Sequence, residues 1–384
     1  MYFDEAPKTN PADFYNFEEQ RSELMHALRE GARLIVIKGA RRTGKTSLLL
    51  TALNEIGFPY VVIDARVFGK VPTIPHADFI RVLEKGLNDF LFRQKKGIRR
   101  VLDVLKGLRG VEVEFPVRVR LSWGPPERRA DFLDLLTCLG ELAKEEGKTF
   151  VLVLDEGQEL RKIAGYNLTL PLAHIYDYVK SVQVIVTGSQ VGVLTDFLKT
   201  SDPTSALFGR VRVEIEMPRL SADKAKEFLV LGCRQAGIKP KSQVLDDAVK
   251  KLDGIVGWLT YAGALARRLR KFDERVLENA FEEGAKLAAE EMENFLAVRP
   301  AARKRYLSLL IRIARLGRGS WTEIKEGLQI AERKRIADQV FNRALETLKK
   351  WGFICKNEDG TYSVADPLLT HALLTGVVKE HATR

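Results

Sequence analysis

Five short runs rich in valine, leucine and isoleucine occur in the first 220 residues of this 384-residue chain. Runs with few polar residues are typical of strands that are buried on both faces of a parallel sheet. We expect strands at residues 33–37, 60–64, 149–154, 182–186 and 211–215. Helical apolar spacing occurs between them, for instance at 47–53. This alternation predicts an α/β fold, a parallel sheet with helices on both faces.

Residues 66–148, between the second and third runs, follow a different pattern. Helical spacing at 79–91 precedes a basic stretch at 93–109. VEVEFPVRVRLSW (111–123) then alternates apolar and charged residues, which predicts two short strands with one solvated face. Pro116 suits the bend of a hairpin. We interpret 66–148 as an insertion whose charged hairpin either contacts a partner or is only a solvated surface.

The last quarter of the chain has the order of a winged helix-turn-helix. Three helical patterns, the last ending at Gly352, precede two strand patterns around the turn NEDG at 357–360. We therefore predict a winged-helix domain at 299–384. Several basic side chains on or near its third helix could meet the phosphates of duplex DNA: Arg333, Lys334, Arg335, Arg343, Lys349 and Lys350.

Directly after the first predicted strand, GARRTGKT fits the phosphate-binding loop pattern G-x-x-x-x-G-K-[ST]. Glycines let successive backbone N–H groups turn inward around an anion, and the helix that follows directs its positive end at the same point. Lys45 would reach the β- and γ-phosphates, and the Thr46 hydroxyl would bind Mg²⁺. The predicted nucleotide-binding residues are Gly39, Ala40, Arg41, Arg42, Thr43, Gly44, Lys45, Thr46 and Ser47.

Two further strands end in polar residues at the edge where open α/β sheets bind ligands. The third run ends in Asp155-Glu156, so Asp155 is predicted to hold Mg²⁺ and Glu156 to polarise the attacking water. The fourth run is followed by Thr187 and Ser189, either of which could sense the γ-phosphate. The alternative for these two residues is a turn that caps the strand.

Arg210 ends the segment LFGR just before the fifth run. An arginine here could neutralise charge that develops on the γ-phosphate, either in its own chain or in a neighbouring copy. The alternative is an ion pair with a surface acid. An arginine supplied by a second copy would also imply nucleotide-dependent self-association.

Composition bears on the partners, the location and the source of the protein. The net charge is +11, and residues 300–384 hold 16 Lys and Arg against nine Asp and Glu, which hints at a polyanionic partner such as nucleic acid. The alternative, a solvated surface, is the commoner cause of such an excess. Three separated cysteines, a polar N-terminus and the lack of a long apolar run predict a cytoplasmic protein without a membrane span. Nine Asn and nine Gln beside abundant charged residues are typical of a thermophile.

In their order along the chain, GARRTGKTSL, VLVLDEGQEL, VIVTGSQ and LFGR resemble an archaeal P-loop ATPase family of the STAND class, related to the AAA+ and origin-recognition ATPases. The resemblance implies that the segment 14–28 lies near the adenine, with Phe14, Phe17 and Arg21 as adenine-side residues. The alternative for the aromatic residues is packing onto the core ahead of a helix.

The resemblance also implies an ATPase domain at 1–220 and a helical lid at 221–298, with Ser221 as N-cap of the first lid helix. The family often has a proline in the turn above the base, where this chain has Val256. In such proteins the winged module often packs on the nucleotide domain as a clamp, and this remains an alternative to DNA contact.

These features predict a Mg²⁺-dependent ATPase that binds ATP and ADP and acts as a nucleotide-dependent switch, with slow hydrolysis in isolation. No N/T-K-x-D guanine signature is present, which favours ATP over GTP. The alternative function is a DNA-binding regulator in which the nucleotide is mainly structural. The partners expected through the winged helix are therefore duplex DNA or a protein.

Overall fold

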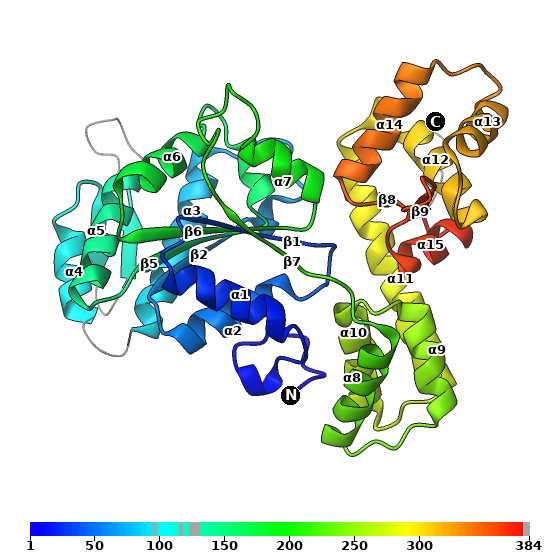
Figure 1. Cartoon of the computed structure of the whole chain (residues 1–384), viewed down its shortest axis with the longest axis horizontal. Helices are drawn as coiled ribbons and strands as arrows, with labels where there is room; N and C mark the ends of the chain where they lie inside the picture. The colour runs from blue at the N-terminus through cyan, green and yellow to red at the C-terminus, as the bar shows by residue number, and fades with distance from the viewer. Residues whose placement is uncertain (95–97, 115–117, 123–130, 379–384) are drawn as a thin grey trace.

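The computed structural model of the chain describes residues 1–94, 98–114, 118–122 and 131–378. A sheet flanked by helices forms the N-terminal part, and two smaller, mostly helical parts follow along the chain (Figure 1). Pro116 and part of the predicted basic stretch at 93–109 lie outside the described residues. The domain limits near 220 and 298 stay predictions.

The predicted parallel sheet is confirmed. Five strands pair in parallel in the order β2-β5-β6-β1-β7, and each matches a predicted run to within two residues at either end. Their bounds are β1 (Leu34–Lys38), β2 (Tyr60–Asp64), β5 (Phe150–Asp155), β6 (Val182–Gly188) and β7 (Val213–Glu216).

Alternate residues of each strand enter two separate cores, as the pleat of a strand requires. On β1, Ile35 and Ile37 pack in one core, and Leu34 and Val36 pack in the other. The first core also contains α1 (Glu18–Arg29) and α2 (Lys45–Ile56). The second core contains α3 (His76–Arg93), α5 (Phe132–Glu145), α6 (Thr169–Tyr178) and α7 (Val191–Leu198). Short 3₁₀ helices connect the elements: η1 (Pro11–Asp13), η2 (Ala65–Phe68), η4 (Gly157–Lys162) and η5 (Pro300–Ala302).

The predicted hairpin within the insertion is confirmed for its described strands. After α4 (Ile98–Lys106), β3 (Val111–Glu114) pairs antiparallel with β4 (Arg118–Leu121). Asn88 of α3 accepts from the Val119 N–H at 2.8 Å and donates to the Val119 carbonyl at 3.0 Å. Strand β4 therefore lies along α3, while Arg118 and Arg120 on it are exposed, and contact of the hairpin with a partner stays a prediction.

Four helices follow the sheet: α8 (Ala222–Gln235), α9 (Ser242–Leu252), α10 (Val256–Leu269) and α11 (Glu274–Ala297). Ser221 is the N-cap of α8, as predicted, and its hydroxyl accepts from the Lys224 N–H at 3.3 Å. Trp258 is buried, and its indole N–H donates to Asp366 at 3.0 Å, which fits a core residue. Among the described residues, no helix is long and apolar enough to cross a bilayer.

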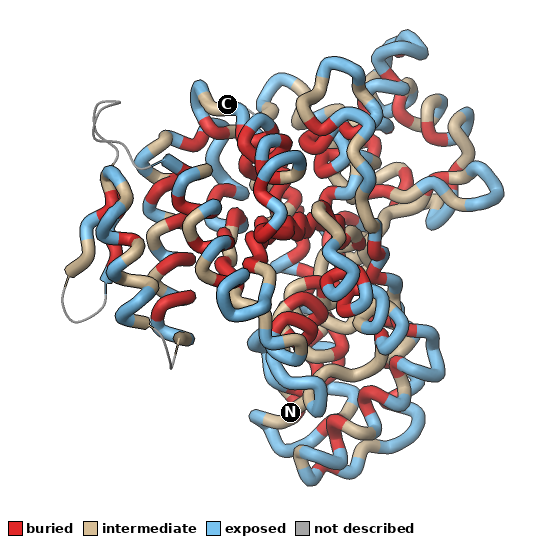
Figure 2. Tube along the Cα trace, turned by 60° about the vertical axis from the view of Figure 1, so that its left-hand side comes forward, coloured by how far each residue is buried: buried red, intermediate tan, exposed pale blue. Residues whose placement is uncertain are grey.

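The winged helix is also confirmed. Its helices are α12 (Arg303–Leu316), α13 (Trp321–Glu332) and α14 (Asp338–Lys350), and its hairpin is β8 (Ile354–Lys356) with β9 (Tyr362–Val364). Ser320 and Glu323 form a capping box at the start of α13. The sequence pattern did not predict α15 (Pro367–Leu374), which packs on α11. Buried residues run continuously through the helical parts as well as the sheet (Figure 2).

The N-terminal segment ties the sheet to the lid, although its sequence suggested only a polar end. The Phe3 side chain is fully buried in a notch beside Gly232 of α8 and Gly263 of α10, where an added Cβ would lie 2.3 Å and 2.2 Å from the ring. Farther along, the Lys8 N–H donates to the Ser47 hydroxyl of α2 at 3.0 Å. One short segment thus contacts both the start of α2 and the lid helices.

We predict that Phe3→Ala lowers the free energy of unfolding by about 3–5 kcal/mol, because it removes a fully buried ring and leaves a cavity. Urea unfolding followed by circular dichroism measures the change. Phe92→Ala is the matched control, since that ring is 90% exposed and its loss should cost about 0.5 kcal/mol or less. Equal effects of the two substitutions would contradict the assigned role of the N-terminal segment.

Candidate functional site

The loop from Gly39 to Thr46 joins β1 to α2 in a conformation that depends on its glycines. Gly44, the N-cap of α2, has φ +92°, in a region that favours glycine. A Cβ on Gly39 would lie 2.7 Å from the Met217 carbonyl oxygen. The loop can therefore pass close to the end of β7 while the N-terminus of α2 faces the space above the sheet.

Lys45 is buried at the centre of this loop. Its Nζ donates to the carbonyl oxygens of Gly39 at 3.0 Å and Ala40 at 2.7 Å. Burial lowers the pKa of Lys45, and the nearby carboxylates of Glu156 and Asp155 oppose that shift. The side chain is thus held by the loop with two acids close by, in the place where the sequence predicted a phosphate contact.

Asp155 and Thr46 meet across the gap between β5 and α2. The Thr46 hydroxyl donates to Asp155 Oδ2 at 3.1 Å, and the Thr187 hydroxyl donates to Asp155 Oδ1 at 2.5 Å. Burial raises the pKa of Asp155, partly offset by the Thr187 hydrogen bond and by Arg66. Thr46 lines the cavity and Asp155 is buried directly behind it. A hydroxyl beside a carboxylate is a donor set that fits Mg²⁺, which prefers oxygen ligands and keeps several waters.

Glu156 has φ +53°, an uncommon backbone conformation for a residue other than glycine. Its Oε2 accepts from the Ser189 hydroxyl at 2.6 Å, the Ser189 N–H at 3.1 Å and the Gln158 side-chain amide at 2.7 Å. Burial would raise the pKa of Glu156, but Lys45 and these hydrogen bonds outweigh it and hold the pKa below its usual range. The two predicted sensors therefore touch the acid pair, Thr187 at Asp155 and Ser189 at Glu156.

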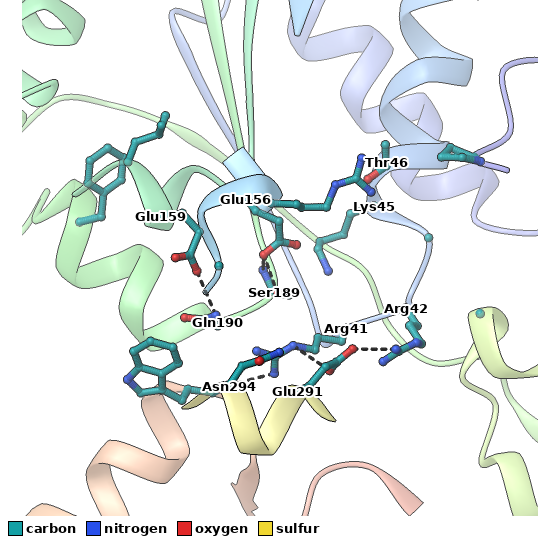
Figure 3. A pocket seen from close by; sticks show the side chains of 18 of the residues that line it. Arg41, Arg42, Lys45, Thr46, Glu156, Glu159, Ser189, Gln190, Glu291 and Asn294 are labelled. Atoms are coloured by element: carbon teal, nitrogen blue, oxygen red, sulfur yellow. Dashed lines mark hydrogen bonds and ion pairs between the residues drawn. The ribbon is translucent and has the colours of Figure 1, made fainter. Parts of the chain in front are cut away.

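Arg41 and Arg42 of the loop converge on Glu291 of α11 (Figure 3). Arg41 Nε lies 3.2 Å from Glu291 Oε2, and Arg42 Nη2 lies 2.6 Å from Oε1. The Arg42 carbonyl accepts from the Gly257 N–H of α10 at 2.9 Å, and its guanidinium lies 3.9 Å from the centre of the Trp258 ring. The phosphate-binding loop is therefore fixed to two lid helices through its arginines.

The winged helix contacts the same region through the end of α14. Arg41 Nη1 donates to the Trp351 carbonyl at 3.4 Å. Lys350 pairs with Asp196 of α7 at 2.8 Å, and a Cβ on Gly192 of α7 would lie 2.7 Å from Lys350 Cα. Helix α7 begins two residues after Ser189, so the winged helix packs against the segment that holds Glu156 in place.

All three parts of the chain line one cavity of about 1600 Å³. The loop residues Arg41, Arg42, Gly44, Lys45, Thr46 and Ser47 border it together with Glu156, Ser189, Glu291 and Trp351. Phe14 and Phe17 also line it, with ring centres 6.1 Å apart. Phe17 is buried in the first core, as the packing alternative expects, and contact of this pair with an adenine stays a prediction.

Arg21 and Arg210, two predicted site residues, pair with other acids outside the cavity. The described residues that line it do not include Arg21, which pairs with Glu55 at 3.2 Å. Nor do they include Arg210, whose Nη2 pairs with Asp177 at 2.5 Å and whose Nε donates to the same carboxylate at 3.1 Å. In this arrangement Asp177 holds Arg210, as the ion-pair alternative expects, and the action of Arg210 within its own chain is untested. Its action in a neighbouring copy stays a prediction.

Sequence reasoning missed Glu291, Trp351 and Arg66. The first two come from helices far along the chain, and no local pattern marks them out from neighbouring acidic and aromatic residues. A signal did exist for Arg66, since it follows β2, a strand that ends at the same edge of the sheet as Asp155. Basic as well as acidic residues that follow strands at that edge are therefore candidate site residues.

A family model for the C-terminal winged helix-turn-helix domain of MCM proteins matches residues 300–365. Among solved structures, the chain is similar to the Walker-type ATPase PABY2304 of Pyrococcus abyssi, with 29% identity and a TM-score of 0.80 over 97% of this chain and 99% of that one. It is also similar to the ORC2 protein of Aeropyrum pernix in ADPNP–ADP complexes, with 15% identity and a TM-score of 0.60 over 98% and 96%. No curated protein sequence matches the chain.

These similarities confirm the predicted fold, a P-loop sheet with flanking helices and a C-terminal winged helix. They also confirm the broader part of the sequence resemblance, because archaeal Walker-type and origin-recognition proteins share this architecture. Its narrower part, the STAND class, stays a prediction. The ORC2 likeness concerns the fold alone, so the role of each residue is argued from the geometry described above.

Proposed function

We propose that this chain is a Mg²⁺-dependent ATPase that works as a nucleotide-dependent switch. The observation that carries the proposal is that Lys45, Thr46 and Glu156 line one cavity beside a glycine-dependent loop, with Asp155 buried behind Thr46 and hydrogen-bonded to it. A buried ammonium group with backbone N–H groups suits a polyphosphate, and the adjoining acid pair suits a metal-assisted hydrolysis. Phe14 and Phe17 line the same cavity and offer rings on which a base could stack, and the lack of a guanine signature favours adenine.

Each residue has a distinct role in the proposed reaction. Thr46 and Asp155 would hold Mg²⁺, which offsets phosphate charge when it is bound. Glu156 accepts a hydrogen bond from the attacking water, and its depressed pKa keeps it ionised at neutral pH. Ser189 fixes the orientation of Glu156 through two hydrogen bonds to Oε2. Lys45 leaves the loop carbonyls to contact the β- and γ-phosphates.

The switch is proposed on the strength of the Glu291 contact. Arg41 and Arg42 belong to the loop that would enclose the phosphates, and their shared partner lies on α11, beside the winged helix. An anion bound at the loop would compete with Glu291 for the same two guanidinium groups. Nucleotide binding would therefore be linked to the position of the lid and the winged helix. This arrangement also accords with the predicted STAND class, in which a winged module packs as a clamp.

A second candidate is the DNA-binding regulator. Arg333, Arg335 and Arg343 lie on the exposed surface of the winged helix, and the MCM-type model matches this part of the chain. Phosphate release in the presence and absence of duplex DNA separates the two functions. Strongly salt-dependent duplex binding without turnover would support the regulator, whereas Mg²⁺-dependent turnover that ignores DNA would support the switch.

Lys45→Ala should weaken ATP and ADP binding about tenfold to a hundredfold, because it removes a charged contact to the phosphates. Isothermal titration calorimetry with Mg²⁺ measures the dissociation constants. Lys144→Ala, at an exposed position on α5, is the control and should bind like the parent protein. If Lys45→Ala also binds like the parent protein, the loop does not hold the phosphates.

Glu156→Gln should lower kcat for ATP hydrolysis at least a hundredfold and leave ADP affinity within about twofold, since it removes the proposed base but no phosphate contact. Phosphate release and calorimetry on the same preparation measure the two quantities. Normal turnover by this variant would place the base elsewhere.

Glu291→Gln should raise ATP affinity about tenfold, because Arg41 and Arg42 lose their carboxylate and become available to the phosphates. The same change should loosen the lid and winged helix, which small-angle scattering would register as a larger radius of gyration. Glu290→Gln is the matched control, an exposed glutamate one residue earlier on α11. A Glu291→Gln protein that equals this control in both measurements would rule out the switch contact.

A further inference from the structure

Arg66 places a guanidinium group beside the acid pair. Its Nε lies 3.8 Å from Asp155 Oδ2, and its side chain lines the same cavity as Lys45 and Thr46. The Arg66 side chain is 53% exposed, whereas that of Asp155 is 2% exposed. Arg66 therefore forms part of the cavity surface, where its free N–H groups can reach a ligand.

The register of the sheet fixes this position. Strands β2 and β5 pair in parallel with Asp64 beside Asp155, and Arg66 follows two residues after Asp64 in η2. Asp64 accepts from the Arg66 backbone N–H at 3.1 Å, from its Nε at 2.7 Å and from its Nη2 at 2.6 Å. A paired carboxylate–guanidinium contact fixes orientation as well as distance, so Asp64 aims Arg66 toward Asp155.

Other arginines around the site pair with groups away from Asp155. Arg210 pairs with Asp177, and Arg41 pairs with Glu291. Arg161 donates to the Gln158 carbonyl at 2.7 Å and lies 5.5 Å from the centre of the Trp351 ring. Arg66 is the arginine within 4 Å of Asp155 in the part of the chain that the structure describes.

We propose that Arg66 is a catalytic residue of the hydrolysis, supplied by the same chain and donating N–H groups to γ-phosphate oxygens. This inference rests on the proposed ATPase function. In that reaction the water oxygen bonds to the γ-phosphorus, and the bond from phosphorus to the bridging oxygen breaks. The bridging oxygen leaves with the electron pair on ADP, and the water proton passes to Glu156. Arg66 transfers no proton; it balances the negative charge that develops on the phosphoryl oxygens.

The test compares Arg66→Ala and Arg66→Lys with the parent protein. Phosphate release gives kcat and KM, and calorimetry on the Glu156→Gln background gives ATP and ADP affinities without turnover. Arg66→Ala should lower kcat about a hundredfold or more and reduce the preference for ATP over ADP, with ADP affinity within about twofold. Arg66→Lys should have a kcat between those of the parent protein and Arg66→Ala, because lysine keeps the positive charge but lacks the paired N–H donors. Arg81→Ala removes a similar exposed ion pair on α3 and serves as control.

The outcomes separate this inference from the proposed function. If the parent protein hydrolyses ATP and Arg66→Ala does so within twofold, the inference is overturned and the ATPase function stands. If the parent protein binds ATP without turnover, the ATPase proposal fails, and the ratio of ATP to ADP affinity decides the γ-phosphate contact. An unchanged ratio in Arg66→Ala overturns that contact. Should Arg66→Ala fail to fold, the same comparisons on Arg66→Lys decide between these outcomes.

Discussion

Glu291 pairs with two arginines of the phosphate-binding loop, and that pairing links the loop to the helix that leads into the winged helix. A loop built to enclose an anion gathers positive charge, and Arg41 and Arg42 add two guanidinium groups to Lys45. Like charges this close require a compensating carboxylate. The chain supplies this carboxylate from α11, the helix that leads into the winged helix. The ion pairs therefore connect the loop to a segment far along the chain.

The neighbouring acids Asp155 and Glu156 show how one edge of a sheet can hold two different functions. Burial dominates at Asp155 and raises its pKa, whereas Lys45, Ser189 and Gln158 lower the pKa of Glu156 despite similar burial. Environments that push two carboxyl groups in opposite directions are typical of sites with divided chemical roles. Here the division fits a metal ligand whose charge is offset once a cation binds and a base that is ionised beforehand.

The sequence was sufficient for features that depend on short segments. The five strands, the phosphate-binding loop, the acid pair, the Ser221 cap and the winged helix follow from local pattern, and the structure has all of them. Contacts between distant segments could not be predicted from the sequence. Neither the pairing of Glu291 with the loop nor the position of Trp351 at the cavity has a local sequence signature. The N-terminal segment shows the same limit, since Phe3 is explained only by the glycines of α8 and α10. Arg210 shows that a motif can leave two outcomes open, since its side chain pairs with a surface acid, Asp177, which local pattern could not identify.

The central claim is that the loop from Gly39 to Thr46 encloses nucleotide phosphates while Asp155 faces the same metal ion. A crystal structure of the chain with Mg²⁺ and a non-hydrolysable ATP analogue tests it most directly. The account predicts the phosphates inside the loop, the metal between Thr46 and Asp155, and the adenine beside Phe14 and Phe17. Nucleotide bound at another surface, or a fully occupied loop with its metal away from Asp155, would contradict it.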